Sequence, residues 1–223
     1  HQSVRAFLID NGGALWVGTE GGIDRLDRQS NQFIHYCSEP GDDTGLNSDR
    51  IRGLYQDSRG IILAATWNGL NQYDPNRDRF LRYRLPKGAV PEASDDDLHL
   101  VHEDSRGTYW FGTYANGLIS HDPASGVWTH YRHNPEDPLS IPSNRVWWVF
   151  ETSDGTIWLS TVGGLAAVSP GVAGFRRVES RPDNPNTLPS HLAFCLCEQG
   201  ADVWIGTRGG GLNRYSRETG KFR

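Results

Sequence analysis

The chain has 223 residues, of which 36% are hydrophobic, 22% are charged and 26 are glycine, a composition within the ordinary globular range. Its formal net charge of −5 gives no support to binding of nucleic acids or anionic membranes. No apolar run approaches about 18 residues, so we expect no transmembrane span, and three cysteines do not make a disulfide framework.

One sequence pattern recurs five times along the chain. Its copies occupy residues 10–23, 57–70, 104–118, 152–165 and 198–212. A threonine in each copy follows the previous one by 46 to 48 residues, at Thr19, Thr66, Thr113, Thr161 and Thr207. A glycine and a later aromatic residue keep nearly the same period. A fixed period of this size indicates a solenoid, a propeller or a linear array.

Each repeat predicts four short strands. Runs rich in Val, Ile, Trp, Phe and Tyr are bounded by Gly, Asp, Asn and Pro, which is the pattern of consecutive hairpins. No segment has a sustained apolar period of about 3.6 residues, so helix is excluded as the main element. We therefore predict an all-β fold, a β-propeller of five four-stranded antiparallel blades of about 47 residues. The predicted blades of this single segment, residues 1–223, cover residues 4–36, 51–84, 98–132, 146–179 and 192–223.

The two ends of the chain bear on whether these blades close a ring. Propellers usually avoid open edges by closing, often with a strand from one end completing the blade at the other. Neither end of this sequence offers such a strand. We expect an arc of a larger array, with a closed five-bladed ring as the alternative.

The recurring residues have structural tasks. We expect positive φ angles where glycine closes the first turn of four repeats, at Gly13, Gly60, Gly107 and Gly155. The aspartates that precede three of these glycines are expected to accept hydrogen bonds from nearby backbone amides, at Asp10, Asp57 and Asp104. The tryptophans of the second strands are expected to pack between adjacent blades, at Trp16, Trp110, Trp158 and Trp204.

The pattern Asp-x-x-Gly-x-x-Trp-x-Gly-Thr-x-x-Gly-Leu, of which residues 10–23 are an example, resembles the two-component regulator propeller repeat. The resemblance extends over essentially the whole chain. The copies depart from the family pattern at Ala65, Thr152 and Ala201, which puts details of these turns in doubt but not the strand pairing.

The resemblance has functional implications. It implies the periplasmic, extracytoplasmic sensor region of a bacterial histidine kinase, hybrid two-component system or diguanylate cyclase, usually a seven-bladed propeller. It also implies a receptor homodimer that ligand capture or docking shifts between signalling states, with the kinase or cyclase output domain outside this chain.

Catalytic and metal-binding constellations are not evident in the sequence. A propeller glycosidase or lyase needs paired carboxylates, yet Glu20 is the only carboxylate in the five loops between second and third strands. The histidines are scattered, whereas a metal site needs three or four converging ligands. We therefore expect no enzyme activity, no metal and no cofactor.

The variable rim of the propeller is the predicted ligand-binding site. The loops between second and third strands contribute Glu20, Trp67, Asn68, Tyr114, Asn116 and Arg208, and the entries to the first strands contribute Arg52, Arg145 and Trp147. Aromatic faces beside Asn, Arg and Glu suit an oligosaccharide or another polar metabolite. The alternative is that Trp67 and Trp147 fill blade interfaces and that the charged residues form a solvated rim.

Three functions are compatible with these features. The one we favour is a non-catalytic sensory segment that contacts neither nucleic acid nor membrane. The second is an architectural or protein-docking propeller without a small ligand, which would show an exposed apolar patch. The third is a polysaccharide-active enzyme, which would show two rim carboxylates about 5–10 Å apart.

Overall fold

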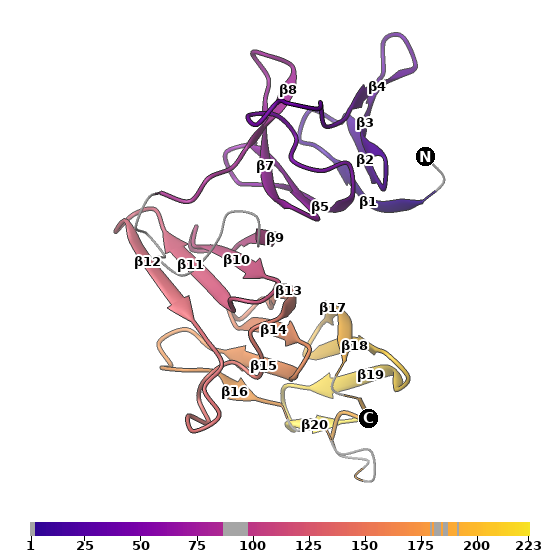
Figure 1. Ribbon diagram of the computed structural model, residues 1–223. Helices are drawn as coiled ribbons and strands as arrows, with labels where there is room; N and C mark the ends of the chain where they lie inside the picture. Colours follow the sequence, from indigo (N-terminus) through magenta and orange to yellow (C-terminus); the bar gives the residue numbers. More distant parts are fainter. Residues whose placement is uncertain (1–2, 87–97, 179, 181–183, 185–186, 191) are drawn as a thin grey trace. The chain divides into compact units, whose positions relative to one another are not determined.

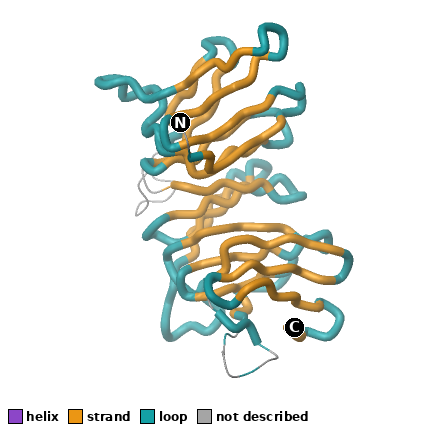
Figure 2. The backbone as a smooth tube through the Cα atoms, turned by 90° about the vertical axis from the view of Figure 1, so that its right-hand side faces the viewer, coloured by secondary structure: helices purple, strands orange, loops and turns teal. Residues whose placement is uncertain are grey.

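The described part of the chain folds into strands and loops. The computed structural model describes residues 3–86, 98–178, 180, 184, 187–190 and 192–223 (Figure 1). Within these residues there is no helix, and the strands form five four-stranded sheets (Figure 2). The predicted all-β class and the five four-stranded antiparallel blades are confirmed.

Every sheet consists of four strands that follow one another in the sequence. The first contains β1 (Val4–Ile9), β2 (Leu15–Thr19), β3 (Gly22–Asp27) and β4 (Gln32–Tyr36). The second contains β5 (Ile51–Gln56), β6 (Ile62–Thr66), β7 (Gly69–Asp74) and β8 (Arg79–Arg82). The third contains β9 (Leu98–Glu103), β10 (Tyr109–Thr113), β11 (Leu118–Asp122) and β12 (Val127–Tyr131). The fourth contains β13 (Val146–Glu151), β14 (Ile157–Thr161), β15 (Gly164–Val168) and β16 (Arg176–Arg177). The fifth contains β17 (Ala193–Gln199), β18 (Asp202–Thr207), β19 (Gly211–Ser216) and β20 (Lys221–Phe222).

The chain forms two compact units, residues 1–103 and residues 104–223, and each has aromatic packing between its sheets. In the first unit, Trp16 of β2 is buried, and its ring centroid lies 4.8 Å from that of Tyr73 in β7. In the second unit, Trp158 of β14 is buried, and its centroid lies 5.2 Å from that of Tyr215 in β19. The expected packing of these tryptophans between adjacent blades is therefore confirmed. Trp204 is only half-buried.

The first turn of the repeat has the expected geometry. The φ angles of its four glycines lie between 78° and 84°. In the third repeat, Asp104 accepts backbone hydrogen bonds from Arg106 and Thr108 at 3.0 and 2.9 Å. The other oxygen of Asp104 accepts the indole N–H of Trp110 at 3.0 Å, which the sequence analysis did not anticipate. The turn aspartate therefore ties the turn to the aromatic strand that follows.

A recurring hydrogen bond joins the first turn of one sheet to the next sheet. In the second unit, the carboxylate of Glu151, the last residue of β13, accepts both the backbone N–H and the hydroxyl of Ser105 at 2.7 Å. Equivalent pairs form between Ser58 and Glu103 and between Ser153 and Glu198, and a shorter version forms between the amide of Asn11 and Gln56. We call these contacts the Ser–Glu clamp. In the sequence the acceptor is a Gln or Glu at or next to the end of the first strand, and the donor directly follows the turn Asp or Thr of the preceding repeat.

Replacing Glu151 by alanine is expected to lower the free energy of unfolding by about 1–2 kcal/mol. The change removes two hydrogen bonds to a charged acceptor, whose value is moderated here because Ser105 is exposed and Glu151 is only half-buried. Urea denaturation checks the prediction, with Glu136→Ala as the control because Glu136 is an exposed loop residue. Equal stability of the two variants would show that the clamp contributes nothing measurable.

Candidate functional site

The hairpins between second and third strands hold their first loop residue in a fixed backbone position. In all five repeats the threonine hydroxyl donates to the carbonyl of the repeat glycine, at distances of 2.7 to 3.0 Å. The amide of the next residue donates to the strand-entry carbonyl, as from Trp67 to Arg50 at 2.9 Å. The backbone of the hairpin is therefore alike from repeat to repeat. The side chain of its first loop residue varies and is Glu20, Trp67, Tyr114, Val162 or Arg208.

A β-bulge near the start of the first strand positions the rim residues that belong to that strand. The pairing register shifts between Val4 and Ala6 in β1, and at the equivalent points of β5, β13 and β17. The residues at the shifts are Arg5, Arg52, Trp147 and Phe194. Bulges re-aim a side chain out of the regular alternation. Arg52 and Trp147 were predicted from the sequence, whereas Arg5 and Phe194 were not, although the repeat period alone could have indicated them.

A cavity in the first unit brings together three of the predicted rim residues. It has a volume of about 490 Å³ and is lined by Arg5, Glu20, Arg50, Ile51, Arg52 and Trp67. The guanidinium carbon of Arg52 lies 4.2 Å from the centroid of the Trp67 ring, and that of Arg50 lies 5.8 Å from it. Trp67 is 53% exposed, so it does not fill a blade interface. Glu20, Arg52 and Trp67 were predicted; Arg5 was not.

The lining of the cavity is rich in charged groups. Its described residues include three arginines and one carboxylate, that of Glu20. Arg5 holds Glu20 in an ion pair, with its Nε donating to the carboxylate at 3.0 Å. The guanidinium groups of Arg50 and Arg52 lie near the ring of Trp67 and contribute cation–π attraction. The planar N–H edge of a guanidinium matches the oxygens of a carboxylate or sulfate. The arrangement therefore presents an aromatic ring and guanidinium groups side by side, as a site for a polar ligand does.

A second group of predicted residues meets in the other unit. The guanidinium carbon of Arg145 lies 4.2 Å from the centroid of the Tyr114 ring, and its Nε donates to the Tyr114 carbonyl at 3.3 Å. The ring of Trp147 meets Tyr114 edge to face, with centroids 6.2 Å apart. These three side chains form an aromatic and cationic surface of the same kind as that around Trp67.

The remaining predicted residues do not join either group. Asn68 and Asn116 donate their backbone amides to the threonine hydroxyls of their own hairpins, at 3.1 and 2.8 Å. Arg208 has an exposed side chain, and its carbonyl accepts the Ser190 hydroxyl at 2.8 Å. Within the described residues, no three His, Cys, Asp or Glu side chains gather where they could hold a metal ion.

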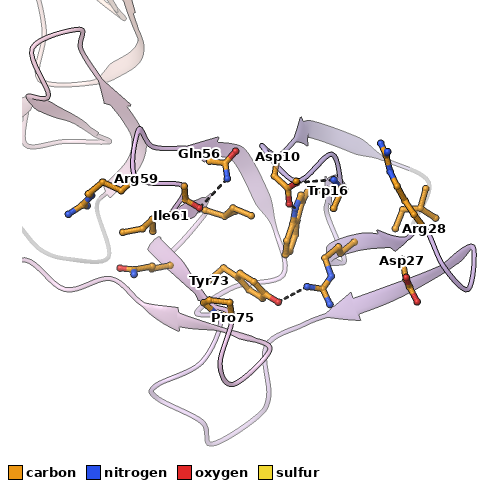
Figure 3. A pocket seen from close by; sticks show the side chains of 16 residues that line it. Asp10, Trp16, Asp27, Arg28, Gln56, Arg59, Ile61, Tyr73 and Pro75 are labelled. Carbon is orange, nitrogen blue, oxygen red and sulfur yellow. Dashed lines mark hydrogen bonds between the residues drawn. The ribbon is translucent and has the colours of Figure 1, made fainter.

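A further cavity in the first unit, of about 720 Å³, involves none of the predicted rim residues (Figure 3). Its polar groups are engaged in the packing of the fold. The indole of Trp16 donates to Asp10 at 2.8 Å, and Arg25 donates to the hydroxyl of Tyr73 at 2.5 Å. Burial and a hydrogen bond to Asp78 raise the pKa of Tyr73 above its ordinary value, so the phenol stays neutral. We assign this cavity to packing between the first two sheets.

Consecutive four-stranded sheets that repeat with one sequence period, and that carry variable side chains on fixed hairpins, define a β-propeller. Residues 140–163 match the family model described as two component regulator propeller, which confirms the predicted resemblance. Comparison with curated proteins gave no match. The structure has no helix, in the part of the chain that it describes, with the length and apolar character to cross a membrane.

Solved structures share the fold. An extracellular domain assigned to the hybrid two component system BT3049 from B. thetaiotaomicron is 24% identical, with a TM-score of 0.79 over 100% of this chain and 30% of that chain. The corresponding domain of BT4673 from the same organism is 20% identical, with a TM-score of 0.75 over 95% of this chain and 27% of the other. Virginiamycin B lyase from Staphylococcus aureus is 13% identical, with a TM-score of 0.65 over 99% of this chain and 69% of that chain. The chain thus spans less than a third of the length of the two-component structures that it matches.

Proposed function

We propose that this chain is a non-catalytic sensory segment in the extracytoplasmic, periplasmic part of a bacterial two-component receptor, and that it binds a small polar ligand at its rim. The observation that carries the proposal is the convergence of Glu20, Arg52 and Trp67 on one cavity. The repeat family and the extracellular domains of two-component systems with the same fold support the receptor context. In the complete receptor, which we take to be a homodimer, the ligand would have to bind one signalling state more tightly than the other.

The composition of the cavity argues against hydrolysis. A glycosidase mechanism uses two carboxylates about 5–10 Å apart. Among the described residues that line the cavity, Glu20 is the single carboxylate, and Arg5 forms an ion pair with it. This part of the lining therefore lacks the pair of carboxylates that a glycosidase uses.

Protein docking is the second candidate function, and an exposed apolar face of β1 is the feature that bears on it. Val4, Phe7 and Ile9 of β1 are exposed and form an apolar row. The positions equivalent to Val4 in the other sheets are buried, at Ile51, Leu98, Val146 and Ala193. Because these positions face a neighbouring sheet, we assign the β1 row to packing against a further blade rather than to a separate partner.

A thermal-shift screen of the full chain tests ligand binding. The panel contains oligosaccharides, amino acids and small organic acids. We expect at least one to raise the melting temperature, because a ligand at about 100 times its Kd stabilises the folded state by about 2.7 kcal/mol. The shift should disappear in Trp67→Ala and persist in Trp148→Ala, a matched change at another exposed tryptophan. Silence of a folded protein toward the whole panel would contradict the proposal and favour docking.

A further inference from the structure

We propose that an apolar patch beside β16, the edge strand of the fourth sheet, is the surface through which two copies of this chain associate. The patch consists of Leu139, in the connector before β13, and of the turn between β15 and β16, residues 170–174. This inference rests on the homodimer in the proposed function and assigns a surface to it.

The turn of the fourth sheet differs in chemistry from the four equivalent turns. Its residues 170–174 read Pro-Gly-Val-Ala-Gly, without a polar side chain. The residue that starts each of the other turns is Asp or Ser, and its side chain accepts a backbone amide within the turn, as Asp74 and Asp122 do at 2.9 Å. Because polar sequences form the equivalent turns, folding of the blade does not require the apolar sequence of the fourth one.

Leu139 is an exposed apolar side chain that the core does not use. In three connectors the apolar residue that anchors the loop lies two positions before a serine whose hydroxyl accepts a backbone amide. These anchors are all buried, at Leu46, Ile141 and Leu188. Leu139 is not such an anchor, and it is 52% exposed.

Leu139 and the turn form one continuous surface. The amide of Phe175 donates to the Leu139 carbonyl at 2.7 Å, and a Cβ built on Gly174 would lie 2.6 Å from the Cβ of Leu139. Pro170 packs against the first turn of the same sheet, near Gly155. Val172 projects from this supported backbone and is 60% exposed. Contiguous exposed apolar side chains of this kind mark a protein-association surface.

The charges beside the patch indicate a second copy of this chain as the partner. Glu136 is exposed on the connector, three residues before Leu139. Arg176 is exposed on β16, and its guanidinium donates to the hydroxyl of Tyr215 in the fifth sheet at 3.1 Å. Neither charge has an ion pair with another described residue. In a twofold contact a surface meets itself, so the acidic side of one copy meets the basic side of the other while the apolar centres pack together.

Sedimentation velocity of the full chain tests the association over a range of protein concentrations. A reductant is present, because the three cysteines are exposed and would otherwise link chains covalently. The patch has far fewer residues than the roughly 20–30 a side of a standard interface, so we expect a weak, reversible dimer. A chain that stays monomeric at every concentration would overturn the proposal.

Val172→Asp places an uncompensated charge at the centre of the patch and is expected to weaken the dimer about 10-fold or more. The side chain is exposed, so the variant should fold, which circular dichroism checks. Val127→Asp is the matched control, because Val127 is a similarly exposed valine in the third sheet. Dimerisation that Val172→Asp leaves unchanged, or that Val127→Asp weakens equally, would show that the patch is not the interface.

A charge exchange tests the twofold arrangement. Glu136→Arg and Arg176→Glu are each expected to weaken the dimer several-fold, and the double variant is expected to recover most of the loss, because opposite charges face each other again. A double variant as weak as either single one would overturn the twofold pairing.

The dimer patch and the sensory function can fail separately. A ligand-induced thermal shift that depends on Trp67, in a chain that never dimerises, would overturn the patch while leaving the sensory function intact. A dimer that is sensitive to Val172→Asp, together with a silent ligand panel, would support the patch and contradict ligand sensing.

Discussion

Replacing Gly117 by alanine is expected to lower the free energy of unfolding by about 3 kcal/mol or more. Gly117 has a φ of +93°, a conformation that side chains rarely adopt, and a Cβ built there would lie 2.2 Å from the carbonyl oxygen of Tyr131. Left-handed backbone alone costs roughly 1 kcal/mol for alanine. The remainder arises because two backbone segments must separate, which weakens the pairing of β11 with β12 near Leu118 and Tyr131.

Gly126→Ala is the matched control for this prediction. Gly126 has a φ of +72°, and a Cβ built there would meet no atom within 4 Å. The control therefore includes the left-handed backbone but not the collision, and we expect a loss of only about 1 kcal/mol. Urea denaturation of both variants measures the difference. Equal losses would mean that the hairpin relaxes freely and that close approach to Tyr131 places no constraint on the rim loop carrying Tyr114.

Much of the fold could be predicted because five copies of one pattern agree, whereas a single copy would leave its secondary structure ambiguous. The predicted blades at residues 4–36 and 51–84 begin where β1 and β5 begin, at Val4 and Ile51. The ends of the blades are less well predicted: the fourth strand of the blade predicted to end at residue 84 is Arg79–Arg82. First and fourth strands both pair on one side only. The opening residues of most first strands are buried, at Ile51, Leu98, Val146 and Ala193, whereas most residues of the fourth strands are exposed or half-buried, so the fourth strands depend more on the loops around them.

The candidate site could be predicted only in part. The loop residues Glu20 and Trp67 were identifiable because the hairpin has a fixed place in the repeat. The meeting of Arg5 with Arg50 and Glu20 was not, because it depends on a bulge that becomes visible only when two strands are paired. Arg208 illustrates the opposite limit, since a residue with the right type and the right repeat position lies outside the cavity.

The largest polar contribution to the repeat is expected from its turn aspartate, and Asp104→Asn should lower the free energy of unfolding by about 2–3 kcal/mol. The Asp104 side chain is fully buried and accepts hydrogen bonds from two backbone amides, from the Arg106 guanidinium and from the Trp110 indole. An amide of the same shape replaces one acceptor oxygen with a donor, so at least one buried N–H loses its partner.

The pH dependence of stability should differ between the wild-type chain and Asp104→Asn. Burial alone would raise the pKa of Asp104, but the hydrogen bonds from Trp110 and Arg106 outweigh it and hold the pKa below its ordinary value. The carboxylate therefore stabilises the fold above its unfolded pKa, which is about 3.9, and this contribution is lost as the pH falls through the lower folded value. The stability difference between the two proteins, measured by denaturation from about pH 7 to about pH 2, should shrink toward the acid end. A stability difference that does not change with pH would show that Asp104→Asn acts through packing rather than through the charge of the carboxylate.

The fourth repeat supplies an internal control for the bond between the aspartate and the indole. Thr152 stands at the aspartate position there, and the indole N–H of the buried Trp158 has no partner among the described residues. Trp158→Phe therefore removes ring volume but no hydrogen bond, whereas Trp110→Phe removes both. We expect Trp110→Phe to be more destabilising by about 1–2 kcal/mol, the value of a hydrogen bond to a charged acceptor. The excess should vanish when Trp110→Phe is made in an Asp104→Ala background, because no side-chain acceptor for the indole remains there. If the excess persisted in that background, the turn aspartate would act on the backbone alone, and the tryptophan of this repeat would be selected for its volume.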